Sequence, residues 1–452
     1  MASSLELLDQ RLPQPSPPRL LRALRHRNFK LFFIGQGLSL IGTWMTKVAM
    51  FWLVYDLTKH GSYLQAATAL GIVSFVGSVP MFLFAPFSGV FVDRFSRHRV
   101  IVFTQVLAML QSAALAILAL PGWITIPEVI GLALFQGLID ALDTPARQAF
   151  IVEMVDDPVD LANAIALHSS IFNAARLIGP AIGGLILAKF SAGFCFSIDA
   201  VSYMAVIAGL LAMRLKPRPP RVRTGDALSE LKEGIRYTFG FPPLRSILQL
   251  VATVSFCASA LQTLMPILAD HMHNGPQGSG AFGALMASIG VGALVGALYL
   301  ASRKTVVGLA RVMCWAALIL AFAMSGVVAT HNFYIAIVFC ALGGFGMVTH
   351  FASGNTMLQT ITEDAMRGRV MSFFAMLVIG TAPFGALLAG WLGSRIAPAD
   401  VVHLYSAGII VGALLFVRQL PELRKHVRPI YVKKGIIPEV AMALEMDTQE
   451  ER

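Results

Sequence analysis

The chain has 452 residues, of which 56% are hydrophobic and 13% are charged. Soluble proteins carry about 25% charged residues, so this composition excludes an ordinary soluble domain and is typical of a membrane protein that crosses the bilayer many times. The formal net charge of +10 fits basic cytoplasmic loops, and we expect no nucleic-acid partner.

The N-terminal stretch is rich in Pro and Arg and has no apolar core preceding a cleavage site, so it predicts a cytoplasmic arm rather than a signal peptide. Beyond it, apolar segments of about 20 residues recur, each long enough to cross the bilayer as a helix. Segments of this length exclude membrane-spanning strands. The twelve predicted spans are 31–56, 64–91, 100–120, 126–146, 163–188, 192–213, 246–269, 281–301, 307–329, 333–354, 370–395 and 399–417.

Basic residues predict the orientation of these spans. Of the 35 Lys and Arg residues, only Lys59, Lys189 and Arg395 fall in the odd-numbered connections. Because Lys and Arg accumulate on the cytoplasmic side, we expect both termini there. The longest connection divides the chain in two, and the predicted regions are an arm 1–28, an N-terminal six-helix half 29–213, a cytoplasmic linker 214–245, a C-terminal six-helix half 246–418 and a cytoplasmic tail 419–452.

Within the linker, "DALSELKEGIRYTF" has apolar residues at helical spacing. It predicts either a helix on the membrane surface or an ordinary linker helix. The two halves are weakly repeated: "FSGVFVDRFSR" aligns with "LVGALYLASRK", which pairs Gly89 with Gly296 and sets Asp93 opposite Leu300. Repeated halves are a recurring architecture of secondary transporters, so the repeat favours alternating access.

The stretch "GVFVDRFSRHR" (89–99) sets charges directly after an uncharged apolar run. A carboxylate at the membrane edge needs cationic partners, and Arg neighbours are at hand, although a plain basic loop is the alternative. The stretch resembles the loop signature of the major facilitator superfamily. The positions that match the signature are Gly89, Asp93, Arg94, Arg97 and Arg99, whereas Ser96 and His98 depart from it.

This resemblance implies a cytoplasmic latch, in which Asp93 and Arg97 bind groups on the fourth and eleventh helices. Asp143, with Asp140 one turn earlier, is the candidate partner on the fourth helix. The alternative is that the two acids only neutralise Arg147, which lies on the same helix.

A second stretch, "AARLIGPAIGG", resembles a motif associated with antiporters of the same superfamily. Its matching residues are Gly179, Pro180, Gly183 and Gly184. Small residues allow close helix approach and Pro permits a bend, so simple tight packing is the alternative. Further stretches over most of residues 22–420 are similar to bacterial exporters of the enterobactin-exporter type. The resemblance implies an all-α fold of twelve helices in two pseudo-repeated halves.

Ionisable residues inside spans are functional candidates. Lys47, Arg176 and Asp199 predict one buried charge cluster, with Asp199 as a proton-responsive acid or, alternatively, a static ion pair. His168 and His350 are interpreted as packing residues, and a proton-relay role is the alternative. By resemblance, helices one, four, seven and ten face a central cavity. Candidate residues for a substrate pocket there are Trp44, Phe51, Gln136 and Gln262.

The four Cys residues lie far apart without metal-ligand spacing, and no nucleotide-binding or hydrolase motif occurs, so we expect no metal, no cofactor and no enzyme activity. The sequence predicts a monomeric, proton-coupled exporter of small amphipathic molecules, such as siderophores or drugs, in the bacterial cytoplasmic (inner) membrane. The alternatives are a lysophospholipid or lipid transporter, an importer of the same fold, or a receptor or sensor that does not transport.

Overall fold

The computed structural model describes residues 19–59, 63–155, 157–215, 227–272, 278–303 and 305–437. In this part of the chain a short 3-10 helix, η2 (Arg19–Arg25), is followed by helices α1 to α14. Twelve helical spans are long and apolar enough to cross a membrane. The predicted all-α fold with twelve spans is confirmed.

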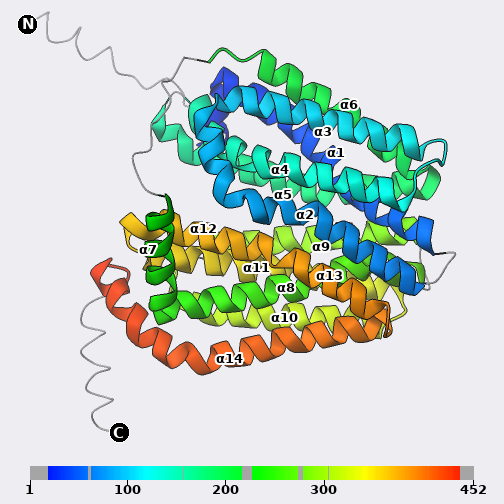
Figure 1. Cartoon of the computed structure of the whole chain (residues 1–452). Coiled ribbons are helices and arrows are strands. Elements are labelled where there is room, and N and C mark those ends of the chain that lie inside the picture. Colours follow the sequence, from blue (N-terminus) through cyan, green and yellow to red (C-terminus); the bar gives the residue numbers. More distant parts are fainter. Residues whose placement is uncertain are drawn as a thin grey trace, which may run out of the picture.

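The N-terminal half forms the upper group of helices in Figure 1. Helix α1 packs against α5 and α6, helix α2 against α4, and helix α3 against α4 and α6. Their bounds are α1 (Arg27–Thr58), α2 (Tyr63–Arg94), α3 (Arg97–Ala119), α4 (Ile126–Met154), α5 (Pro158–Lys189) and α6 (Ala192–Leu211).

The C-terminal half forms the lower group in Figure 1. Its bounds are α8 (Pro242–Asp270), α9 (Gly278–Ser302), α10 (Leu309–Ala329), α11 (Phe333–Ile361), α12 (Asp364–Gly380), α13 (Ala382–Gly393) and α14 (Pro398–Lys433). Helices α12 and α13 together make one span. The sequence predicts a continuous helix over 370–395, but the structure interrupts it at Thr381, two residues before Pro383, whose ring nitrogen cannot donate a helical hydrogen bond.

The linker contains helix α7 (Ala227–Gly240), which confirms the predicted helical stretch. Figure 1 shows α7 crossing the ends of the bundle helices, and it contacts α8 and α12. Arg369 Nη1 lies 2.6 Å from Glu233 Oε2, and the backbone N–H of Glu363 donates to the Tyr237 hydroxyl at 3.5 Å. The described contacts are those of a linker helix, and a position along the membrane surface stays a prediction.

Helix α14 is longer than the sequence predicts. The predicted span ends at residue 417 and a tail follows from 419, whereas α14 continues to Lys433. The extension is amphipathic: Leu423, Val427 and Tyr431 recur every four residues and are all buried. At 1.5 Å per residue, a helix of this length spans about 54 Å, so its end extends well beyond a hydrocarbon core of about 30 Å.

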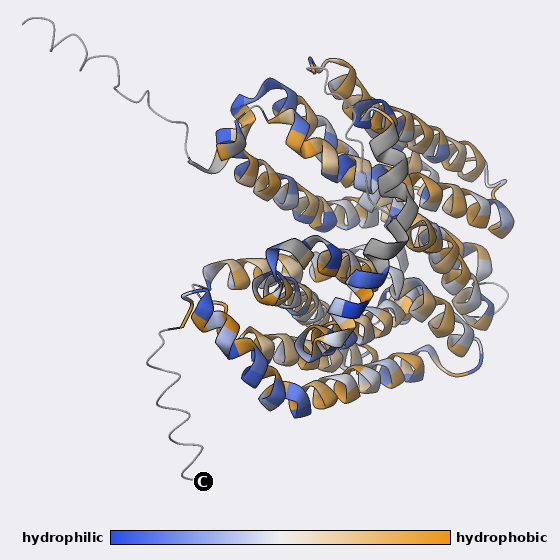
Figure 2. Cartoon of the chain, turned by 60° about the vertical axis from the view of Figure 1, so that its left-hand side comes forward, coloured by the Kyte–Doolittle hydropathy of each residue, from blue (hydrophilic) through white to orange (hydrophobic). Residues whose placement is uncertain are grey.

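Two ends of the bundle can be distinguished. The end that holds η2, α7 and the last turns of α14 is called the termini end, and the opposite end, with the α1–α2 and α5–α6 connections, is called the far end (Figure 1). Figure 2 shows hydrophobic residues along the middle of the helices and hydrophilic residues gathered at helix ends and connections. The helix middles therefore present the apolar surface that a bilayer requires.

Candidate functional site

The two halves are joined at the far end. The Tyr55 hydroxyl of α1 donates a hydrogen bond of 2.7 Å to Asp270 Oδ2 of α8. Trp52 stacks on Phe282 of α9 with ring centroids 6.1 Å apart. The Ser279 hydroxyl donates to the carbonyl oxygen of Leu187 at 2.9 Å. Direct hydrogen bonds and ring stacking close the space between the halves at this end.

Glycines bring the halves together in the adjacent layer. A Cβ built on Gly184 of α5 would lie 2.5 Å from the Cα of Gly283 on α9. Likewise, a Cβ on Gly71 of α2 would lie 2.9 Å from the Cα of Gly390 on α13. Both distances are shorter than real Cβ contacts, so these crossings exist because the side chains are absent.

Between described side chains, the hydrogen bonds and ring contacts that cross from one half to the other all lie in the far and middle layers. Lys47 and Gln262 lie in middle turns of α1 and α8, yet both are exposed. Lys47 has acidic and aromatic neighbours on helices of its own half, so its exposure is to a polar space rather than to lipid. The candidate site is therefore sought among the polar side chains of the middle layer.

Trp44 of α1 is the centre of this site. The Lys47 Nζ atom lies 4.8 Å from the Trp44 ring centroid, and the Arg176 Cζ atom of α5 lies 5.5 Å from it. Phe172 contacts the same ring edge-on at 5.8 Å. Gly179 leaves room for this ring, because a Cβ there would lie 2.6 Å from the Cβ of Trp44. Two cationic groups thus lie over the indole ring, and cation–π attraction stabilises this arrangement.

Asp140 and Gln136 of α4 belong to the same wall. Gln136 Nε2 donates to Asp140 Oδ1 at 2.9 Å. The Lys47 ammonium of α1 attracts the Asp140 carboxylate electrostatically. The sequence predicts a latch role for Asp140, whose described hydrogen bond is the one from Gln136, and the latch role stays a prediction.

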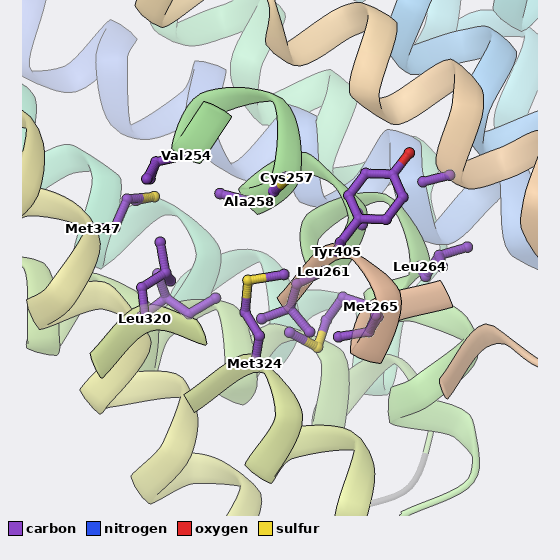
Figure 3. Packing of buried hydrophobic residues seen from close by; sticks show 14 of the residues in the cluster. Val254, Cys257, Ala258, Leu261, Leu264, Met265, Leu320, Met324, Met347 and Tyr405 are labelled. Carbon is purple, nitrogen blue, oxygen red and sulfur yellow. The ribbon is translucent and has the colours of Figure 1, made fainter. Parts of the chain in front are cut away.

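The facing wall comes from the C-terminal half. Arg176 Nη2 donates to the Met347 sulfur of α11 across 3.9 Å. Met347 lines a small, mainly apolar pocket whose polar side-chain group is the amide of Gln262. Figure 3 shows Met347, Leu320, Met324 and Leu261 converging from α11, α10 and α8. The complete pocket lining is Ala258, Leu261, Gln262, Ile289, Leu320, Met324, Cys340, Gly343 and Met347.

Comparison with known proteins agrees with this architecture. A family model described as transmembrane secretion effector matches residues 20–449. The chain belongs to this family. It is a transporter of the major facilitator type rather than a member of a catalytic family.

Several relatives of this transporter are bacterial. It is 28% identical over 363 residues to a staphyloferrin A transporter of Staphylococcus aureus, covering 79% of this chain and 88% of the relative. It is 29% identical to the multidrug efflux pump Tap of Mycolicibacterium fortuitum, covering 86% and 95%. It is 26% identical to the enterobactin exporter EntS of Escherichia coli O1:K1, covering 88% and 93%.

Solved structures show the same fold at lower identity. A D-xylose–proton symporter superposes with a TM-score of 0.68 at 14% identity, covering 86% of this chain and 96% of that one. An inward-facing bacterial homolog of the human lysosomal transporter Spinster superposes with a TM-score of 0.63 at 14% identity, covering 90% and 98%. These likenesses establish the fold of this transporter, and its site is argued from its own residues.

Asp199 lies apart from the two cations of the transporter. Its carboxylate accepts hydrogen bonds from Ser112 of α3 at 2.8 Å and from Ser202 of α6 at 3.4 Å. Among described residues no Lys or Arg forms an ion pair with it. The expected cluster with Lys47 and Arg176 does not form, because Asp199 lies between α1, α3 and α6 whereas Arg176 lies on α5.

The structure describes the side chains of only some of the predicted latch residues. The side chains of Gly89, Asp93 and Arg94 lie outside the described residues, although α2 runs through all three positions. Ser96 caps α3 by accepting a hydrogen bond from the N–H of Arg99. The latch itself therefore stays a prediction.

Arg97 forms a hydrogen-bonded ion pair with Glu153, near the end of α4, at 2.8 Å. The expected partner, Asp143, is buried deeper in the half, where it pairs with Arg147 and accepts hydrogen bonds from Thr104 and Gln105. The Asp143–Arg147 ion pair is the contact that the alternative interpretation expects, and a latch role for Asp143 stays a prediction. Glu153 is not among the residues that the sequence predicts for the latch, although an acid in the last turn of α4 is a natural partner for an Arg in the basic loop.

The antiporter-type motif serves two surfaces. Gly179 and Gly183 pack against α1, where a Cβ on Gly183 would lie 3.2 Å from Met45. Gly184 packs against α9 across the halves, and Pro180 contributes its carbonyl oxygen to the same crossing. Tight packing inside one half and contact between halves therefore both occur, at different residues of one motif.

The remaining candidates lie in packed surroundings, and a substrate-binding role for Phe51 stays a prediction. Phe51 is half-buried against the hydrophobic core. His350 is buried and its ring donates to the Met313 carbonyl oxygen at 3.0 Å, while His168 packs on Phe32 with ring centroids 5.8 Å apart. The four cysteines are buried thiols. In the described part of the chain no group of His, Cys, Asp and Glu could hold a metal ion.

Proposed function

We propose that this chain is a monomeric, proton-coupled exporter of small amphipathic molecules that works by alternating access in the bacterial cytoplasmic membrane. The observation that carries the proposal is the pair of cations on Trp44, which lies between two halves joined at the far end. Relatives named as siderophore and drug transporters support the substrate range and the export direction.

The basic residues gather at the termini end, and this supports the proposal that this end faces the cytoplasm. In that orientation the far end is extracellular or periplasmic, and the halves meet there, so the site loads from the cytoplasm in this state. Rocking of the halves would then break the Tyr55–Asp270 contact and release the substrate outward.

Asp140 is the carboxylate that we propose for proton coupling. It faces the Lys47 ammonium within the site, whereas Asp199 is enclosed by hydroxyl groups away from it. A substrate that attracts Lys47 would leave Asp140 without its cation and favour its protonation. Release of the substrate would return Lys47 to Asp140 and expel the proton. Asp199 is the alternative coupling residue.

The test measures flux in proteoliposomes under an imposed pH gradient. The probes are three aromatic compounds of different charge: 1-anilinonaphthalene-8-sulfonate, neutral N-phenyl-1-naphthylamine and cationic ethidium. We expect gradient-driven movement of at least one probe by the wild type. We expect Asp140→Asn to lose the pH dependence and keep passive exchange. Unchanged pH dependence in Asp140→Asn with loss in Asp199→Asn would transfer the role to Asp199.

Orientation has its own test. A phosphatase or fluorescent reporter fused after residue 225, in the linker between the halves, must read as cytoplasmic. A signal from the opposite side of the membrane would overturn the proposed loading direction, because the site would then open outward in this state.

A further inference from the structure

Arg176 is an unusual residue for the middle of a membrane-spanning helix. Its described polar contact is a long one to the Met347 thioether, and no carboxylate among the described residues pairs with it. A guanidinium has five N–H donors and stays charged. Holding such a group away from bulk water without a counter-ion costs several kcal/mol, so the position calls for an anion supplied from outside the chain.

The charges around Arg176 do not balance. The site holds two cations, Lys47 and Arg176, against the single carboxylate of Asp140. The next acid along α4, Asp143, is already paired with Arg147. One positive charge therefore remains uncompensated in the described site. It lies next to the flat face of the Trp44 indole.

The opposite wall has a different character. Met347 contacts Arg176 and also lines the pocket of the C-terminal half, so the cation and the pocket adjoin. The pocket is mainly apolar, and its methionines are flexible and polarisable side chains that adapt to varied shapes. An occupant that satisfies both walls has an anionic group at one end and an apolar or aromatic body at the other.

We propose that Arg176 and Lys47, held on the Trp44 ring, form the subsite for the anionic group of an amphipathic substrate, whose apolar body contacts Met347 on the facing wall. This inference rests on the proposed transport function and adds the charge class of the substrate. A carboxylate, a sulfonate or a phosphate fits the subsite, since each offers two acceptor oxygens to the guanidinium fork.

The test is binding to purified protein in phosphatidylcholine nanodiscs, with empty nanodiscs subtracted. The probe is 1-anilinonaphthalene-8-sulfonate, and its neutral counterpart is N-phenyl-1-naphthylamine. We expect Arg176→Gln and Lys47→Gln each to raise the Kd of the anion about tenfold or more, since a charge-assisted hydrogen bond is lost. The neutral compound should bind both variants as it binds the wild type.

The chain offers a matched control. Arg395 lies over the Trp391 ring at 4.4 Å, at the end of α13, away from the site. Arg395→Gln removes a cation from an indole in the same way and should leave the Kd of the anion unchanged. Arg176→Lys keeps the charge and should recover part of the affinity, which separates loss of charge from disturbed packing at a buried position.

Two competitors distinguish a soluble acid from a lipid as the source of the anion. The first is 2-naphthoate and the second is lysophosphatidylglycerol, each added to the nanodisc assay. Displacement of the probe by either one, weakened in Arg176→Gln, supports the subsite and tells which source it accepts. Equal affinity of wild type and Arg176→Gln for the anion, or parallel loss of the neutral compound, would overturn the proposal.

Failure of the subsite can be told from failure of transport. If the anion binds with the expected variant effects but no probe moves in proteoliposomes, the subsite stands and the transport proposal fails. If gradient-driven flux occurs for ethidium and N-phenyl-1-naphthylamine and the anion shows no saturable binding, transport stands and the charge class assigned here is wrong.

Discussion

Asp160 shows how the chain holds a carboxylate that has no exposed surface. It lies in the first turn of α5 and binds Arg22, Arg25 and His26, with 2.8 Å to Arg25 Nε and 2.9 Å to His26 Nε2. The backbone N–H of Ala23 donates to Asn163 at 2.9 Å in the same place. The N-terminal arm is thereby fastened to the beginning of α5.

Asp160→Asn should loosen this fastening. The substitution leaves two Arg residues without the buried carboxylate, so we expect the free energy of unfolding to fall by about 3 kcal/mol. Trypsin should also cut faster after Arg22 and Arg25. Thermal unfolding in detergent and limited proteolysis are the measurements.

Asp157→Asn is the control for that substitution. Asp157 also contacts Arg25, at 3.0 Å, but its side chain is 42% exposed. Exposed ion pairs contribute about 0–1 kcal/mol, so this variant should behave nearly as the wild type. Equal effects of the two substitutions would mean that burial of Asp160 adds nothing.

Ion pairs within one helix can be predicted from the sequence, whereas contacts between distant parts of the chain cannot. The Asp143–Arg147 pair follows from i, i+4 spacing on one helix, and the sequence analysis had it as an alternative. The Arg22–Asp160 pair joins residues 138 positions apart. The Trp44–Arg176 contact joins α1 to α5. No local spacing encodes such pairs, because they depend on which helices become neighbours.

At the scale of elements, helix α5 contacts the other half through Gly184. Its crossing with α9 is a backbone contact, since Gly184 and Gly283 meet without side chains between them. The sequence motif indicates that the small residues of α5 allow close helix packing, but it does not assign each glycine to a partner helix. That assignment depends on the rotation of α5, which distant packing sets.

Gly184→Leu should separate α5 from α9 at this crossing. Even the first added carbon would lie 2.5 Å from Gly283, and Leu adds three more, so the far-end closure should be lost. Gly131 of α4 has nothing within 4 Å of its Cβ position, so Gly131→Leu is the control. Transport should fall at least about tenfold in the first variant only.

Cross-linking provides a second test of the Gly184→Leu prediction. Cysteine pairs placed on α5 and α9 near the crossing should react readily in the wild-type background and slowly with Gly184→Leu. Retained cross-linking and flux would show that the crossing tolerates a side chain, contrary to the distances in this structure.

For the molecule as a whole, the sequence predicts the helix count, because hydrophobic length is a local property. It missed the break at Thr381 and the continuation of α14 to Lys433. It could not predict which end is closed. Two states of a transporter differ by a few kcal/mol, and that difference is the sum of long-range contacts such as Tyr55–Asp270.

Tyr55→Phe tests this closure directly. The substitution removes one hydroxyl and the 2.7 Å hydrogen bond to Asp270, while the ring keeps its packing. A net loss of about 1 kcal/mol would shift the ratio of the two states about fivefold toward opening at the far end. The native cysteines are buried, so spin labels can be directed to introduced exposed ones.

Labels at Lys59 and Ala397 report the far end, and labels at Arg99 and Glu363 report the termini end, since all four positions are exposed. With Tyr55→Phe, double electron–electron resonance should show a longer-distance population at the first pair and a shorter one at the second. Tyr405→Phe is the control, because the Tyr405 hydroxyl donates at 2.9 Å to Gly385 within one half. Its loss should lower stability without moving either distance. If Tyr55→Phe leaves both distances unchanged, the stacked Trp52–Phe282 pair and the glycine crossings hold the far end closed by themselves.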